Sequence, residues 1–392
     1  LCEGTSMSTL KVDAIRHNSA TSDAITTHSD GTASAKIIDI AGGPLSNRNL
    51  FVNGACRIGQ RGSTSLGSGY GGVDRWVQYI GGGGATTTSQ DTDVPTGQGF
   101  RNSIKLDVTT ALASGSSNWA WLGQYIEAQD CQSICKGTAN AKQLTLQFWV
   151  KSPKTGTHTV RLDVQDSNDG VGATYTVSSA NTWEKKTVTF PASTSGTIND
   201  DNGRGVHVLW VLSAGTDFTS GTLNTTWASW TNANTAETTT NVLDSTSNNF
   251  YLTGVQLEVG DTATTFEHCS YGEELRKCQR YVFLATVTGT TSEVTNRPVC
   301  MGMYYSSSDV RGIIDFPVQM RSAPSLTSSS VSNGFYIHRN NGADMFDGFG
   351  IWYATNNRAN IRNNTQVSGT GGNAGMINQE TGGSFIRFEA EL

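Results

Sequence analysis

The stretch FYLTGVQLEVGDTATTFEHCSYGEELRKCQRY, residues 250–281, contains two different hydrophobic periodicities. Within residues 251–259 apolar side chains recur at every second position, which is the spacing of a β-strand. Farther along, Leu275, Cys278 and Tyr281 recur at helical spacing. The stretch therefore predicts that a strand completes one domain and that a short helix leads into the next.

The composition of the chain favours an all-β protein. Charged residues make up 15% of the 392 residues, aromatic residues make up 9%, and Gly occurs 44 times. Such a chain is neither a typical helical enzyme nor a disordered tail. The net charge of -6 without a Lys/Arg cluster argues against nucleic acid as a partner. There is no run of 18 apolar residues, so we expect no helix that spans a membrane.

The sequence predicts three segments. Residues 1–47 are polar and form an extended N-terminal arm, residues 48–268 form a jelly-roll β-sandwich, and residues 269–392 form a short linker helix and a second, smaller β-sandwich. Alternating strand patterns such as SIKLDVTT (103–110) support this division. The turn PKTG (153–156) is predicted to reverse the chain within a hairpin.

Cysteines and acidic turns give no clear metal site. Seven irregularly spaced cysteines do not form a disulfide framework, and CQSIC (131–135) lacks a second pair of zinc ligands. The turns QDSNDG (165–170) and NDDNG (199–203) have the composition of turn formers. Calcium ligands and a catalytic carboxylate pair remain alternatives for them. We expect no cofactor, and the sequence does not favour a structural calcium ion.

The motifs of several enzyme classes are missing from the sequence. It contains no Gly-x-Ser-x-Gly elbow, no His-Glu-x-x-His and no phosphate-binding loop. We therefore expect a protein that is not an enzyme.

Aromatic residues in polar surroundings are the best candidates for ligand binding. Flat rings stack on sugars, and neighbouring amide and hydroxyl groups bind sugar hydroxyls. Alternatively, the Trp side chains fill the ends of the sandwich, and the C-terminal aromatic loops pack against sister chains. The candidates are Trp119, Trp121, Trp227, Trp230, Tyr304, Tyr305, Trp352 and Tyr353.

Several motifs in order resemble one family. The segments NLFVNGACRIGQRGSTS (49–65), WEKKTVTFP (183–191) and DNGRGVHVLWVLSAGTDFTSGTLNTTW (201–227), followed by residues 250–281, resemble the jelly-roll module of bacteriophage tail fibres and related virion appendages. The resemblance covers about residues 48–282. Related carbohydrate-binding modules often carry an acidic residue just after Asn-Gly that helps to hold calcium, whereas here Ala-Cys-Arg follows at 55–57.

The resemblance implies a homotrimeric tail fibre that recognises a host surface polysaccharide by non-catalytic binding. Its N-terminal arm would attach to other virion proteins, and the protein would be assembled in the host cytoplasm and located on the virion. The alternative is a capsid decoration or appendage protein with a structural role. A depolymerase is disfavoured because no short β-helix repeat is found.

The predicted helix has two alternative roles. Its stripe of Leu275, Cys278 and Tyr281 is too short to be stable alone in water. Either three chains meet through it on a threefold axis, where it forms a trimer and hinge contact, or it packs beneath its own C-terminal sandwich.

Overall fold

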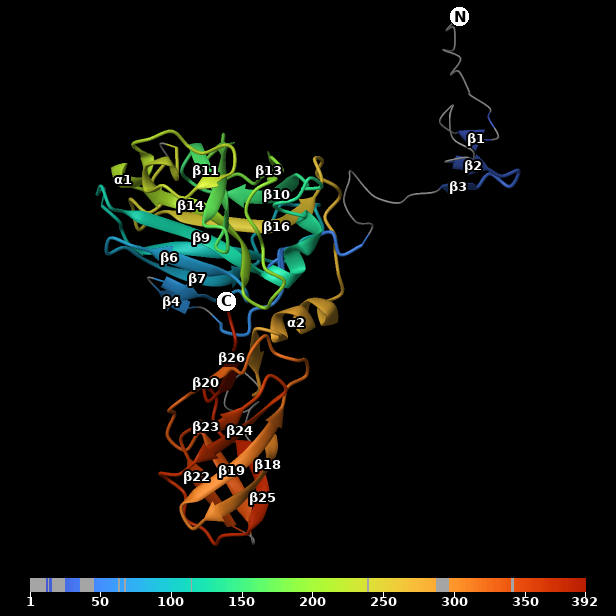
Figure 1. Ribbon diagram of the computed structural model, residues 1–392. Helices are drawn as coiled ribbons and strands as arrows, with labels where there is room; N and C mark the ends of the chain where they lie inside the picture. The colour runs from blue at the N-terminus through green and yellow to red at the C-terminus, as the bar shows by residue number, and fades with distance from the viewer. Residues whose placement is uncertain are drawn as a thin grey trace, which may run out of the picture.

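The computed structural model describes residues 12, 14–15, 25–35, 46–62, 64–66, 68–113, 115–237, 240–286, 296–339 and 342–392. A large β-sandwich, helix α2 (Tyr271–Gln279) and a smaller β-sandwich follow one another (Figure 1). A small antiparallel sheet of β1 (Ala14–Ile15), β2 (Ile25–Thr27) and β3 (Ala33–Ala35) lies apart from both in the N-terminal segment. The all-β prediction with a short connecting helix is confirmed.

Two antiparallel sheets form the first sandwich. In spatial order, the six-stranded sheet contains β13 (Glu184–Phe190), β10 (Leu144–Lys151), β16 (Asn249–Val259), β8 (Ser103–Thr110), β7 (Ala85–Asp91) and β4 (Thr64–Leu66). The seven-stranded sheet contains β15 (Ala228–Ser229), β12 (Asp169–Val177), β11 (Gly156–Val164), β14 (Arg204–Ala214), β9 (Trp119–Glu127), β6 (Val77–Ile80) and β5 (Ser68–Tyr70). Short helices in the connections are η1 (Ala128–Ile134), α1 (Thr216–Thr219) and η2 (Asn232–Asn234).

The connections give this sandwich its jelly-roll topology. The chain moves between the sheets several times, so that β10 lies between β13 and β16 although β11 and β12 belong to the opposite sheet. Antiparallel partners distant in sequence are typical of jelly rolls. The PKTG turn therefore connects the two sheets, and the prediction of a hairpin at this turn is wrong. A turn of this size can either pair two strands or pass between layers, and local sequence does not distinguish these outcomes.

Aromatic side chains fill the centre of the jelly roll. Trp76 and Trp210 are almost fully buried, and their ring centroids lie 5.7 Å apart. Phe51 packs 5.1 Å from Trp76, and Phe148 packs 5.3 Å from Trp210. Burial of large aromatic side chains is a main stabilising contribution in a sandwich of this kind.

Strand β16 is buried on both faces. Its aliphatic side chains belong to the main core, whereas Gln256 and Glu258 bond the segment that follows the strand. Gln256 donates to Glu258, and Glu258 accepts hydrogen bonds from the backbone N–H and the hydroxyl of Thr264. Buried polar groups need such partners. The exit segment 260–269 thus covers the strand that precedes it.

Helix α2 begins with a capping box. The side chain of Ser270 accepts from the backbone N–H of Glu273, and the Glu273 carboxylate accepts from the backbone N–H of Ser270. This reciprocal pair satisfies two N–H groups that have no partner within the helix. It explains why a helix of nine residues begins at this position.

The second sandwich has a small and a large sheet. The small sheet contains β17 (Val282–Leu284), β26 (Ile386–Glu389) and β20 (Ser325–Ser328). The large sheet contains β22 (Gly342–Phe346), β21 (Phe335–Arg339), β25 (Ala374–Gln379), β18 (Arg297–Ser306), β19 (Asp309–Asp315), β24 (Arg358–Asn363) and β23 (Gly350–Ala354). Phe335, Phe346 and Phe388 belong to its separate hydrophobic core.

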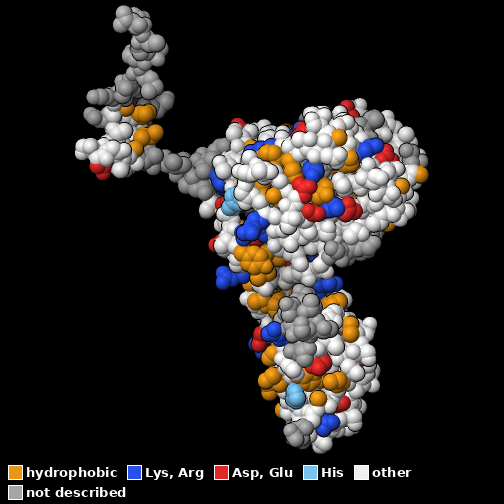
Figure 2. Space-filling model, turned by 180° about the vertical axis from the view of Figure 1, so that it is seen from behind, with side chains coloured by type: hydrophobic (Ala, Val, Ile, Leu, Met, Phe, Trp, Pro, Cys, Tyr) orange, Lys and Arg blue, Asp and Glu red, His pale blue; other side chains and the backbone are white. Residues whose placement is uncertain are grey.

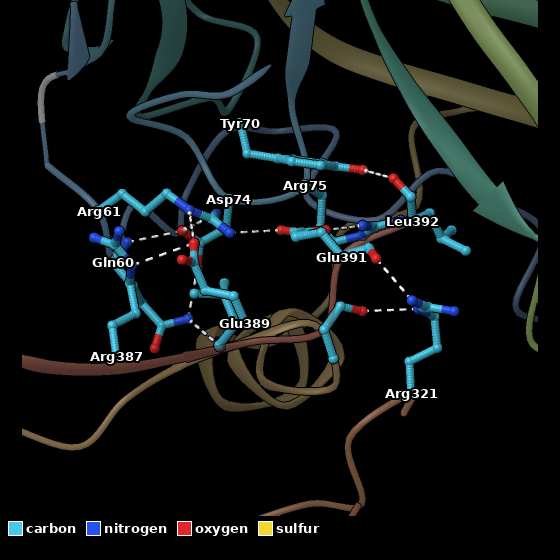
Figure 3. Close-up of polar contacts among 12 residues, drawn as sticks. Gln60, Arg61, Tyr70, Asp74, Arg75, Arg321, Arg387, Glu389, Glu391 and Leu392 are labelled. Atoms are coloured by element: carbon cyan, nitrogen blue, oxygen red, sulfur yellow. Dashed lines mark hydrogen bonds and ion pairs between the residues drawn. The ribbon is translucent and has the colours of Figure 1, made fainter. Parts of the chain in front are cut away.

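Buried ion pairs connect the two sandwiches (Figure 3). Arg61 bonds Glu389 at 2.9 Å and Glu391 at 3.0 Å, and Arg75 pairs with Glu391. The Tyr70 hydroxyl donates to the carbonyl oxygen of Leu392 at 2.8 Å. The segment after β26 therefore returns to the jelly roll, so that β26 and α2 both link the domains.

Arg280 and Tyr281 add a second set of contacts at this junction. The Arg280 Nε donates to Glu127 at 2.8 Å, and the Tyr281 hydroxyl donates to Glu127 at 2.7 Å. Glu127 is almost fully buried, and the guanidinium carbon of Arg75 lies 3.5 Å from the centre of the Tyr281 ring. Burial excludes the water that would otherwise screen these charges.

Candidate functional site

A cavity of about 280 Å³ opens on the outer face of the seven-stranded sheet. Beneath it, Trp121, Leu209 and Val211 form a small hydrophobic cluster separate from the main core. The segment from α1 to η2 lies along this face, where Phe218 stacks on Trp119 at 4.8 Å. The cavity is lined by Trp119, Trp121, Tyr125, Asp163, Val164, Gln165, Asn168, Asp169, Arg204, Gly205, His207, Leu209 and Trp230.

Strand register places three of these side chains in one row. Asp163 on β11 lies opposite His207 on β14, and His207 lies opposite Tyr125 on β9. The His207 ring stacks on Tyr125 with centroids 4.1 Å apart and meets Trp121 edge-on at 4.6 Å. A Cβ atom at Gly123 would overlap the carbonyl oxygen of Val208 and lie 3.2 Å from Nε2 of His207, so glycine allows the close approach of the β14 backbone and also leaves room for this ring.

Burial shifts the pKa values of two groups in this row in opposite directions. Loss of hydration, together with the positive charges of nearby Arg204 and Arg161, lowers the pKa of His207 to about 3. Loss of hydration also raises the pKa of Asp163 to about 6, although Arg161 opposes this shift. Near pH 7 the imidazole is therefore neutral, and the carboxylate is largely ionised.

Charged side chains stack on the aromatic walls of the cavity. The guanidinium carbon of Arg204 lies 4.1 Å from the centre of the Tyr125 ring, and that of Arg161 lies 4.9 Å from the Trp230 ring. Arg161 also donates to Asp163 at 2.8 Å. These contacts fix the orientation of both arginines.

The cavity combines flat rings with hydrogen-bonding groups of both kinds. Rings of Tyr125 and Trp230 are partly exposed, the Asp163 carboxylate is an acceptor, and Arg204 is a donor. His207 Nε2 is buried and has no hydrogen-bond partner among the described residues. Such a surface suits a ligand with one apolar face and several hydroxyl groups.

The structure brings together three of the four predicted Trp residues of the jelly roll. Trp119, Trp121 and Trp230 all line the cavity. Trp227 does not line it: its ring packs partly against the core, and its Nε1 donates to the carbonyl oxygen of Pro191 at 2.7 Å. The Lys136 ammonium lies 4.3 Å from its centre. Trp227 is therefore a packing residue, as the alternative reading of the tryptophans expected.

The aromatic residues predicted in the second sandwich differ in exposure. Tyr304 is fully buried, and its hydroxyl donates to Asp344 at 2.6 Å, so its ring is not accessible to a ligand and the prediction for this residue is wrong. Tyr305, Trp352 and Tyr353 are exposed. Hydrophobic side chains are visible on the surface of this domain in Figure 2.

The helical stripe packs within its own chain. Cys278 and Tyr281 are almost fully buried, and Tyr281 contacts Glu127 of the jelly roll, so neither is accessible to another chain. The trimer-contact prediction for these two residues is therefore wrong, because the junction already covers them. Leu275 is half-buried, and α2 lies at the junction between the domains (Figure 1).

Sequence reasoning missed Tyr125, His207 and Arg204. Tyr125 lies four residues after Trp121 in NWAWLGQYIE, with Gly123 between them, and therefore on the same face of the strand as Trp119 and Trp121; this alternation could have identified it. His207 and Arg204 come from β14, which meets β9 only through long-range pairing. No local signal connects them.

The acidic turns have structural roles. Asp201 accepts from the backbone N–H of Gly203 at 2.7 Å within its own turn, as a turn former does, whereas Asp166 accepts from the backbone N–H of Asn199 at 2.9 Å and so connects the two turns. Within the described residues, no three His, Cys, Asp or Glu side chains are grouped to hold a metal ion. In the same part of the chain, no helix has the length and apolar character needed to cross a membrane.

Comparisons with known proteins give structural similarities. No known protein family matches the sequence. No curated protein is similar to it. A solved domain of tailspike protein 4 from bacteriophage CBA120 has 14% identity and a TM-score of 0.29, covering 54% of this chain and 21% of that chain.

Two modules from Clostridium thermocellum are also similar. The family 11 carbohydrate-binding module of Lic26A-Cel5E has 14% identity and a TM-score of 0.27, covering 52% of this chain and 97% of that chain. The C-terminal family 22 carbohydrate-binding module of Xyn10B has 12% identity and a TM-score of 0.29, covering 56% of this chain and 100% of that chain.

Proposed function

We propose that this protein binds carbohydrate without cleaving it, through the cavity on the seven-stranded sheet. The observation that carries the proposal is the convergence of Tyr125, Trp230 and Trp119 with Asp163 and Arg204 around one open cavity. A sugar ring has an apolar face for stacking and hydroxyl groups at its edge. The cavity offers surfaces for both.

The size of the cavity supports a short segment of a polysaccharide as the ligand. Its volume of about 280 Å³ is near the lower end of the range for small-molecule sites. Because this cavity, which we call the groove, is open to solvent, the remainder of a polymer can extend beyond it. A single contact of this size is expected to be weak, so useful affinity would require several copies of the site.

We further propose that the protein is a virion component, a homotrimeric tail fibre that uses these sites to recognise the host surface. The ordered motifs between residues 48 and 282 support this proposal through their resemblance to phage fibre modules. Three sites on one particle appendage would bind a polysaccharide with greater avidity than one. The N-terminal arm would join the fibre to other virion proteins.

Binding to an array of bacterial surface polysaccharides tests the groove. We expect the protein to bind a subset of the glycans. Trp230→Ala and Tyr125→Ala should each weaken binding at least tenfold, because each removes an aromatic wall of the cavity and Tyr125 also holds His207 and Arg204 in place by stacking. Trp183→Ala is the matched control, since Trp183 is a half-buried residue that bonds Asp93 outside the cavity. Equal losses in all three variants, or no saturable glycan binding by the wild type, would refute carbohydrate binding at the groove.

Sedimentation equilibrium and labelling of whole particles test the assembly. A homotrimer would have three times the chain mass of 41.8 kDa. An antibody against the protein should label the tail and block adsorption of the phage. Labelling spread over the head would instead identify a decoration protein, and a monomer in solution would exclude the homotrimer.

A further inference from the structure

Two arginines with like charge lie side by side on the outer face of the C-terminal sandwich. Arg311 on β19 is directly opposite Arg362 on β24. Like charges at directly opposed positions of an antiparallel pair destabilise a sheet. Their guanidinium carbons lie 4.5 Å and 4.2 Å from the centre of the same ring, that of Trp352. The ring holds both cations close together.

The charge of this pair is only partly compensated. Asp309 accepts from Nη2 of Arg311 at 2.7 Å and from its Nε at 3.1 Å. Tyr305 stacks on the other side of Arg311, with the guanidinium carbon 3.7 Å from its ring centre. In the described part of the chain, Arg362 has no carboxylate partner within 4.0 Å. Thus the Asp309 carboxylate bonds Arg311 and not Arg362. The nearby Asp347 carboxylate, which lines a cleft together with Arg362, accepts instead from Asn333 and Gln366.

A polar cleft of about 270 Å³ adjoins Arg362. Residues at the ends of β20, β23 and β24 and in the adjoining loops form its walls, and most of them have small hydroxyl or amide side chains. Side chains of this kind bind sugar hydroxyls. The cleft is lined by Ser328, Ser329, Ser330, Asp347, Gly348, Phe349, Gly350, Arg362, Asn363, Asn364, Thr365 and Gln366.

We propose that this surface is a second binding site, specific for an anionic sugar whose acidic group lies against Arg362 and Arg311 while its hydroxyl groups enter the cleft. A carboxylate or sulfate accepts several hydrogen bonds from planar guanidinium groups. An anion here offsets the repulsion within the arginine pair. Trp352 and Asp309 position the two cations before the ligand arrives.

This site goes beyond the proposed function of the groove. It lies on a different domain and selects for charge, whereas the groove selects for stacking faces. Arg362 reaches both the aromatic surface and the cleft, so it is the residue on which the anionic preference depends.

Matched charged and neutral oligosaccharides test the proposal. Calorimetry would compare hexagalacturonic acid with its methyl ester, and sulfated dextran oligosaccharide with dextran, for the full chain at two salt concentrations. We expect the acidic member of at least one pair to bind and its neutral counterpart to bind at least tenfold more weakly. High salt should weaken binding of the acidic ligand, because salt screens the attraction between exposed charges. The carboxylate and sulfate pairs distinguish the two acidic groups.

Two arginines on one strand provide the variant and its control. Arg362→Gln should reduce acidic binding at least tenfold, whereas Arg358→Gln should change it less than twofold. Arg358 lies on the same strand, is exposed and pairs with Asp315 at 3.0 Å. Tyr125→Ala in the groove should leave acidic binding unchanged, which separates failure of this site from failure of the groove.

The unliganded variant gives an independent readout. Without ligand, the thermal unfolding midpoint of Arg362→Gln should equal or slightly exceed that of the wild type, because one of two opposed positive charges is removed. An acidic oligosaccharide should raise the midpoint of the wild type but not that of the variant. Equal effects of Arg362→Gln and Arg358→Gln on binding would overturn the proposal. The proposal would also be overturned if neither acidic probe binds at 10 mM. This concentration is about 100-fold above a typical useful Kd of ~0.1 mM.

Discussion

Asp163 and His207 lie side by side in the groove and respond to burial in opposite ways. Burial disfavours the charged form of each, so the carboxyl group keeps its proton to higher pH and the imidazole gives up its proton at lower pH. The ionisation of each group therefore makes the unfolding free energy of the jelly roll depend on pH. Each variant below separates one contribution from the other.

Asp163→Asn should make the jelly roll more stable relative to the wild type as the pH rises. The pKa of Asp163 is about 6 in the folded protein and about 4 when unfolded. Its stabilising contribution is therefore present below pH 4 and lost as the pH rises through 6. Between pH 4 and 7 the difference in unfolding free energy should change by about 2–3 kcal/mol in favour of the variant. Urea denaturation across this range would measure it, and a constant difference would contradict it.

His207→Gln should reduce the sensitivity of the jelly roll to acid. The folded pKa of about 3 lies below the unfolded value of about 6.5, so the stabilising contribution is present above pH 6.5 and lost as the pH falls towards 3. The variant lacks this loss and should gain about 2–3 kcal/mol in unfolding free energy relative to wild type between pH 7 and pH 4.5. The same urea titrations report it. A parallel fall in both proteins would argue against this account.

Residue types and spacing predicted part of the site. The alternation in NWAWLGQYIE correctly indicated that Trp119 and Trp121 share a face, and polar surroundings correctly indicated exposure of Tyr305 and Trp352. The same polar surroundings were misleading for Tyr304, whose strand position turns its ring inward. Exposure depends on which face of a strand meets the core, and composition alone does not contain this information.

Strand β16 and helix α2 lie next to each other in the chain but have different sources of stability. β16 is stabilised by burial between β10 and β8, whereas α2 has nine residues and depends on its capping box and on the junction. The change of periodicity in residues 250–281 revealed both elements in the sequence. It did not reveal the route of PKTG between the sheets, because turn residues specify a reversal and not its partner strand.

Ser270→Ala should loosen the start of α2. The variant removes the side-chain acceptor for the backbone N–H of Glu273, which typically costs about 1 kcal/mol. Because about 1.4 kcal/mol corresponds to a tenfold change in an equilibrium constant, a loss of about 1 kcal/mol should make hydrogen exchange of the first-turn amides about fivefold faster. Ser178→Ala, an exposed serine outside any helix, is the control. Unchanged exchange in α2 would show that the junction alone holds this helix.

The two sandwiches of the whole molecule are joined by charges distant in sequence. Glu391 pairs with Arg75 and Arg61, which are 316 and 330 residues away. The order of the domains could be predicted from the sequence, but these pairs could not be, because nothing in a local pattern connects positions so far apart. The same limitation hid the partnership of Glu127 with Arg280 and Tyr281.

Glu391→Ala should weaken the junction while both sandwiches stay folded. It leaves Arg75 buried without its carboxylate partner, a change that typically costs about 3–5 kcal/mol, and it removes one of the carboxylates that bond Arg61, which keeps Glu389. Small-angle scattering should show a larger radius of gyration and a wider range of domain angles. Asp315→Ala breaks an exposed ion pair and serves as the control, because such pairs contribute little. An unchanged scattering profile for Glu391→Ala would mean that the remaining junction contacts, such as those of Glu127 with Arg280 and Tyr281, fix the domain angle without Glu391.

The return of the segment after β26 to the jelly roll has a mechanical consequence. A pulling force on the C-terminal sandwich is shared between α2 and this segment, because both connect the same two bodies (Figure 3). Two supports side by side also resist twisting, whereas a single linker would act as a swivel. A force applied at the far end of the C-terminal sandwich would therefore move the jelly roll and its groove together with that sandwich, with little relative movement of the two domains.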